Sequence, residues 1–190
     1  MPRRSPGSAS ATREAASAVK TFLLVRHAKS SWDDPALGDF DRPLAPRGEQ
    51  AAPRIARDMR DEGLAPDLVL CSPARRARQT WALMAPAFDG DIPIELRREL
   101  YHAAPHGLLE ALREAPDEAA TVLMIAHSPG MEGLAIGLSG PGSDAVALER
   151  MSAKFPTAAL AAITFDGDRW SDIGENGGAL TRFVSPRELD

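Results

Sequence analysis

The sequence has little of several things that mark specialised classes of protein. One cysteine, Cys71, stands in 190 residues, so no intrachain disulfide can form and nothing indicates an oxidising compartment. No apolar run approaches the roughly 18 residues that a membrane-spanning helix requires, and no signal-peptide core follows Arg3 and Arg4. The net charge of -5 gives no basic face for a nucleic-acid backbone. These absences predict a cytoplasmic protein that binds neither nucleic acid nor membrane.

What the sequence does have is enough apolar material for one core. Hydrophobic residues make up 44% of the chain and charged residues 26%, within the range of a single globular domain. Residues 1–19 are rich in Ser, Ala, Arg and Pro and are predicted to be a disordered tail. We expect residues 20–190 to form the domain.

Short apolar runs alternate with longer helical patterns along the chain. We expect strands buried on both faces of a sheet at 21–25, 67–71, 92–96 and 121–126. A further strand is expected at 158–165, and an edge segment at 180–184. Apolar residues at helical spacing predict four helices, around 51–59, 77–84, 108–112 and 131–138. This alternation predicts an α/β domain with a mainly parallel sheet.

Two of the predicted strand ends are followed by the same dipeptide, Ser-Pro. Residues 71–73 read Cys-Ser-Pro and residues 127–129 read His-Ser-Pro. Serine is a good N-cap and proline a good first helical residue, so each tripeptide predicts a strand that turns directly into a helix. Ligands bind at the carboxyl ends of strands in open α/β sheets, and helix N-termini there favour an anion.

Two histidines follow buried strands. His27 comes after the first strand and His127 after the fourth, so the two imidazoles can converge on one crevice. Three arginines, Arg75, Arg76 and Arg78, fall in the first turns of a helix, where they oppose the macrodipole unless an anion compensates them. Helical spacing alone does not choose among the three.

These segments together resemble the histidine phosphatase superfamily. Residues 26–30, Arg-His-Ala-Lys-Ser, are similar to its signature, and residues 72–80 resemble its second motif, in which the arginine before alanine binds phosphate. That selects Arg76. Residues 127–130, His-Ser-Pro-Gly, resemble the third motif. The segments at 29–32, 41–48, 99–101 and 154–157 look like the SixA branch, the protein phosphohistidine phosphatases.

The resemblance implies a fold and a set of roles. The fold is a phosphoglycerate mutase-like three-layer α/β/α sandwich with a mainly parallel central sheet. His27 is the expected nucleophile, kept neutral by nearby arginines. Arg26, Arg76 and His127 are expected to bind the phosphoryl oxygens, where positioned donors stabilise the transition state. We expect no cofactor, and no His or Asp spacing resembles a metal site.

The chain departs from the superfamily pattern at three positions. Ala28 replaces the usual glycine, Lys29 replaces a common acidic residue, and Asp33 stands where many relatives have asparagine. We assign Asp33 no binding role. The acidic residues between positions 33 and 41, Asp39 among them, are most simply a solvated rim that could also meet a basic partner.

The sequence is compatible with two interpretations of the residue that could protonate the leaving group. Glu99 is the best candidate, although a surface glutamate is an equally good interpretation. A phosphohistidine substrate needs little protonation of its leaving group, whereas an alkoxide needs a proton. We therefore expect a phosphatase for phosphohistidine on a phosphorelay-type protein. The alternatives are a phosphomonoesterase for small phosphorylated molecules and a non-catalytic phosphate-binding module.

Overall fold

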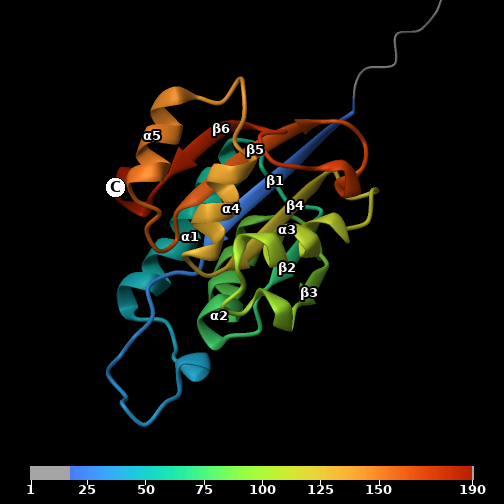
Figure 1. Ribbon diagram of the computed structural model, residues 1–190. Coiled ribbons are helices and arrows are strands. Elements are labelled where there is room, and N and C mark those ends of the chain that lie inside the picture. Colours follow the sequence, from blue (N-terminus) through green and yellow to red (C-terminus); the bar gives the residue numbers. More distant parts are fainter. Residues whose placement is uncertain (1–17, 190) are drawn as a thin grey trace, which may run out of the picture.

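Six strands form one mixed sheet in the computed structural model, which describes residues 18–189 (Figure 1). The strand order is β3-β2-β4-β1-β5-β6. β1 pairs with β4, β4 with β2 and β2 with β3 in parallel, whereas β5 runs antiparallel to both β1 and β6. The bounds are β1 Val19–Arg26, β2 Leu68–Cys71, β3 Ile94–Leu96, β4 Thr121–Ala126, β5 Leu160–Asp166 and β6 Ala179–Val184.

Helices cover both faces of this sheet. α1 (Pro46–Asp61) and α2 (Arg75–Met84) pack on one face, where Leu23 and Val25 of β1 belong to their core cluster. α3 (Pro105–Arg113), α4 (Gly130–Leu138) and α5 (Ala145–Ala153) pack on the other face, against Phe22 and Leu24. Alternate residues of β1 thus point into opposite cores, and the predicted three-layer sandwich is confirmed. Short 3₁₀ helices span Asp39–Asp41, Ala85–Ala87, Arg98–Leu100, Trp170–Asp172 and Pro186–Glu188.

The register of the parallel strands brings three strand ends together. Arg26 of β1 lies opposite Ala126 of β4, and Cys71 of β2 lies opposite Ile125. The next residue of each strand therefore leaves the sheet at the same edge. These residues are His27, His127 and Ser72.

Two expectations about strands were wrong. β3 is not buried on both faces, because it is an edge strand and all three of its residues are exposed. The fifth strand begins at Leu160, not at position 158, because Ala158 takes a left-handed conformation with φ 60° and its N–H donates to the carbonyl of Arg26. The predicted edge position of β6 is confirmed.

The Ser-Pro dipeptides do not begin helices as predicted. α2 begins at Arg75 with Ala74 as its N-cap, and α4 begins at Gly130 with Pro129 as its N-cap, so a short connection separates each strand from its helix. α5 was not predicted at all. Its N-cap is Asp144, whose carboxylate accepts from the N–H of Ala147.

The predicted tail lies almost wholly outside the described residues, which begin at position 18. No helix within residues 18–189 combines the length and the apolar character needed to cross a bilayer.

Candidate active site

His27 presents one defined nitrogen to the site. Its Nδ1 lies 2.8 Å from the carbonyl oxygen of Ala28. A carbonyl can only accept, so Nδ1 carries the proton of the neutral ring and Nε2 keeps its lone pair. The Nε–H of Arg76 donates to that Nε2 at 3.3 Å. His27 therefore directs an unprotonated nitrogen at the guanidinium.

Arg76 joins the two histidines. Its Nη2 donates to Nδ1 of His127 at 3.2 Å, and the two imidazole centroids are 5.0 Å apart. Arg76 is 2% exposed, His27 7% and His127 5%. Burial of a guanidinium beside two neutral rings leaves a positive charge in a site of low polarity. The structure brings the two histidines and Arg76 together in one place.

His127 is held by a serine from the neighbouring strand end. Because its Nδ1 accepts from Arg76, its Nε2 carries the proton and donates to Oγ of Ser72 at 2.7 Å. Ser72 thus orients the second imidazole instead of capping α2, which corrects the role expected for it.

The pKa values keep both rings neutral. Burial and, to a lesser extent, the charges of Arg76, Arg26 and Arg42 together lower the pKa of His27 to about 3, against the opposing effect of the hydrogen bond to Ala28. Burial likewise lowers the pKa of His127 to about 3, with contributions from His27 and Arg76. Both imidazoles are therefore unprotonated near pH 7.

Asp39 is the site residue that sequence reasoning missed. Its Oδ2 accepts from Nη2 of Arg76 at 2.9 Å, and its backbone carbonyl accepts from Nη1 at 2.5 Å. Burial alone would raise the pKa of Asp39, but hydrogen bonds from Arg42, Tyr101 and Arg76 hold it below its usual range. The expected solvated rim is wrong for this residue, because its carboxylate occupies the donors of the guanidinium.

The remaining donors around Asp39 come from a distant segment, which holds Tyr101 and His102, and from the nearby Arg42. Tyr101 donates its hydroxyl to Oδ2 at 2.8 Å, and Nε2 of His102 lies 3.2 Å from the same oxygen. Arg42 donates to Oδ1 at 2.7 Å and anchors the loop through Oγ of Ser30 at 2.6 Å. Arg42 and Tyr101 lie in segments that carried the SixA resemblance, which was the one signal available for them.

Arg26 sits at the border of the site. Its Nη1 donates to the carbonyl of Phe155 at 2.8 Å, and its buried Nε has no hydrogen-bond partner. Burial lowers the pKa of Arg26, which Glu132 opposes. No direct contact with His27, Arg76 or His127 is recorded, although its charge depresses the pKa of His27.

The side chain of Glu99 forms an ion pair with a neighbouring arginine. It is 51% exposed and pairs with Nε of Arg97 at 3.3 Å. Asp33 is also exposed, and only its backbone N–H is bonded, to Oγ of Ser31. Within residues 18–189, no group of three His, Cys, Asp or Glu side chains is placed to hold a metal ion.

Comparisons with known proteins identify the family of this chain. Residues 22–118 match the family model described as the histidine phosphatase superfamily (branch 1). An uncharacterised protein of Mycobacterium tuberculosis is 40% identical over 164 residues, which cover 86% of this chain and 100% of that protein. His127 lies beyond the span of the family match, so the geometry brings it in independently.

Two solved structures of SixA proteins are similar to this one. The proposed phosphohistidine phosphatase SixA of Nakamurella multipartitia superposes with a TM-score of 0.78 at 28% identity, covering 88% of this chain and 96% of that one. The protein histidine phosphatase SixA complexed with tungstate gives 0.72 at 25% identity, covering 90% and 99%.

Fold, paired imidazoles and buried guanidinium together define a phosphatase. The chain belongs to the histidine phosphatase superfamily and to its SixA-type branch.

Proposed function

We propose that this phosphatase transfers a phosphoryl group onto Nε2 of His27 and then to water. The observation that carries the proposal is Arg76, whose guanidinium donates to the lone pairs of both His27 and His127. A phosphoryl group placed there meets a neutral nucleophile and a fixed positive charge.

The reaction has two steps. Nε2 of His27 attacks phosphorus in line, the P–Nε2 bond forms and the bond to the leaving group breaks. Arg26, Arg76 and His127 bind the equatorial oxygens. Water then attacks phosphorus, the P–Nε2 bond breaks, and inorganic phosphate leaves with His27 neutral again.

His127 changes its protonation in this scheme. A dianion beside the ring favours the imidazolium, which donates from Nδ1 to phosphate while Nε2 keeps its bond to Ser72. The carboxylate of Asp39 leaves Arg76 when the anion arrives, because both compete for the same N–H groups.

We propose phosphohistidine on a phosphorelay-type protein as the substrate. Asp39, the carboxylate bonded to Arg76, has a lowered pKa and is a poor general acid. Glu99 remains a candidate acid only if it moves, since its recorded partner is Arg97. A substrate whose leaving imidazole needs little protonation fits this site better than an alkyl phosphate does. The similarity to the solved structure of the protein histidine phosphatase SixA also supports a phosphohistidine substrate. We further propose a cytoplasmic location.

A labelling experiment tests the reaction. After incubation with a labelled phosphoryl donor and rapid quench, we expect a label on the protein that is stable to alkali and lost in acid. His27→Ala should abolish it. His106→Ala is the matched control, because His106 is exposed and lies in α3 outside the site. A wild-type protein that binds phosphate but takes no label would support the non-catalytic module instead.

A substrate comparison tests the specificity. We expect a higher kcat/KM for a phosphohistidine peptide than for sugar phosphates. A clear preference for the sugar phosphates would establish the small-molecule phosphomonoesterase.

A further inference from the structure

A basic pocket opens beside the catalytic strand end. It has a volume of about 680 Å³ and lies between α1, α5 and the segment that follows β6, which are neighbours in Figure 1. Six of its lining residues are basic and one, Glu188, is acidic. The basic residues are Arg26, Lys29, Arg47, Arg150, Lys154 and Arg187.

Most of this positive charge is uncompensated. Arg150 pairs with Glu188. Within residues 18–189, no hydrogen bond or ion pair forms to the side chains of Lys29, Arg47, Lys154 and Arg187. The chain as a whole carries a net charge of -5, so this concentration of cations is local. Four unpaired cations around one concavity attract a polyanion.

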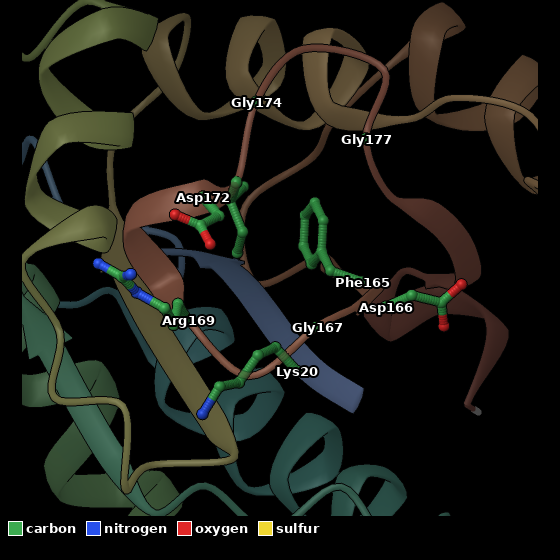
Figure 2. A pocket seen from close by; sticks show the side chains of 9 residues that line it. Lys20, Phe165, Asp166, Gly167, Arg169, Asp172, Gly174 and Gly177 are labelled. Atoms are coloured by element: carbon green, nitrogen blue, oxygen red, sulfur yellow. The ribbon is translucent and has the colours of Figure 1, made fainter. Parts of the chain in front are cut away.

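A second cavity shows what an ordinary charged surface of this protein looks like. It has a volume of about 120 Å³ and lies near the amino end of β1, where Lys20 lines it. Figure 2 shows Lys20 and Arg169 there in the company of Asp166 and Asp172. Carboxylates thus accompany the cations in that cavity, whereas the basic pocket has one carboxylate for six cations.

Apolar residues also line the basic pocket. Ala51, Ala153, Pro156 and the largely buried ring of Phe183 contribute to its lining. The four unpaired cations are all exposed, and they come from separate segments of the chain. Small anions bind to polar groups inside a cavity that encloses most of their surface. A pocket lined by exposed cations and by apolar residues fits a polypeptide with carboxylate and apolar side chains better.

The pocket is adjacent to the nucleophile. Arg26 precedes His27 and Lys29 follows it by two residues, and both line the pocket. Asp39, in the acidic segment between positions 33 and 41, contacts Arg76 and does not line the basic pocket. The site therefore borders both a basic and an acidic segment, and such polarity fixes the orientation of a docked partner.

We propose that this basic pocket binds an acidic segment of the substrate protein next to its phosphohistidine. The proposal rests on the proposed function and specifies the substrate class: a phosphohistidine with Asp and Glu residues nearby. Lys29, Arg47, Lys154 and Arg187 contact those carboxylates, and Phe183 contacts an apolar neighbour.

The test compares two phosphohistidine peptides that differ only in flanking Glu and Asp against Gln and Asn. Wild-type enzyme should favour the acidic peptide by roughly tenfold in kcat/KM, less at high salt. Lys154→Glu with Arg187→Glu should remove that preference. Arg57→Glu with Arg169→Glu makes the same change of charge at exposed sites outside the pocket and should keep it. All proteins should hydrolyse a small chromogenic phosphate equally.

Several results would overturn the docking of an acidic segment. Equal rates on the two peptides, or a preference that survives Lys154→Glu with Arg187→Glu, would each do so. Hydrolysis of a short polyphosphate that depends on these two residues, without any effect of peptide flanks, would assign the pocket to a small polyanion.

Affinity for the unphosphorylated peptides separates the two proposals. If neither phosphopeptide is hydrolysed, the phosphohistidine substrate is wrong. The pocket is still supported in that case if the acidic peptide binds more tightly than the neutral one and Lys154→Glu with Arg187→Glu removes the difference. Equal affinity of both peptides would count against the pocket whatever the activity.

Discussion

The two ends of the central sheet hold their buried cations in different ways. At the amino end of β1, Lys20 is 5% exposed and donates to the backbone carbonyls of Asp117 and Ala119. Those acceptors are fixed parts of the main chain. At the carboxyl end, Arg76 donates to two neutral imidazoles and to Asp39, a loop carboxylate.

The difference separates a structural cation from a functional one. Acceptors in the backbone satisfy Lys20 permanently, and no ligand can replace them without unfolding the connection before β4. The acceptors of Arg76 are side chains, and one of them is an anion that an incoming phosphate can replace. A buried charge is useful for binding when its partners can be exchanged.

Substitutions at the two ends of the sheet should differ most in their effect on activity, and Arg76→Ala should have the largest effect. Loss of the guanidinium removes donors from the transition state, so we expect kcat/KM to fall by roughly 10³-fold. Arg169→Ala at the other end should change it less than about twofold, within the range of an ordinary surface substitution. Steady-state kinetics on a chromogenic phosphate measures both. A loss below tenfold in Arg76→Ala would remove Arg76 from the reaction.

The pH dependence of stability should sharpen the contrast next. In the folded state the pKa values of His27 and His127 are about 3, whereas both are about 6.5 in the unfolded chain. As pH falls below about 6.5, the unfolded state gains protons that the folded state does not, so stability falls until about pH 3. The double variant His27→Asn with His127→Asn should lack this loss.

The size of this effect follows from the linkage relation. Each ring contributes about 1.4 kcal/mol per pH unit below its unfolded pKa. Between pH 7 and pH 5.5 the wild type should therefore lose about 2 to 3 kcal/mol more than the double variant. Urea denaturation at the two pH values measures the difference. Parallel losses in both proteins would mean that the rings are protonated when folded.

Lys20→Met tests the structural end. The substitution keeps the apolar stem but leaves the carbonyls of Asp117 and Ala119 without their donor, at a cost of about 2 kcal/mol. Thermal denaturation measures that loss. Its activity at a temperature where it is folded should match the wild type, and a drop in kcat there would show that the two ends are coupled.

Asp39→Asn should give the smallest effect. A neutral amide competes less well than a carboxylate for Arg76, so inorganic phosphate or vanadate should bind roughly fivefold more tightly. Calorimetric titration measures the affinity. Weaker binding would mean that Asp39 positions Arg76 for the anion and does not compete with it.

Sequence reasoning predicted the fold where a pattern is local. The run at 121–126 predicted β4 with its observed bounds, because five consecutive apolar residues buried between two layers have little choice of structure. It predicted a strand at β3 but was wrong about its burial, since the three residues of that strand do not reveal that the sheet ends there. It missed α5, whose start depends on one capping contact of Asp144.

In the active site, too, some features follow from the sequence and others only from the tertiary structure. The sequence determined which residue types leave the sheet at its carboxyl edge, because strand ends and the histidines that follow them are adjacent in the chain. Resemblance then selected Arg76 among three arginines. Tertiary structure alone decided that Asp39 meets Arg76 across 37 positions and Tyr101 across 62. Those contacts depend on the path of loops that fold back over the sheet, and no local periodicity encodes such a path.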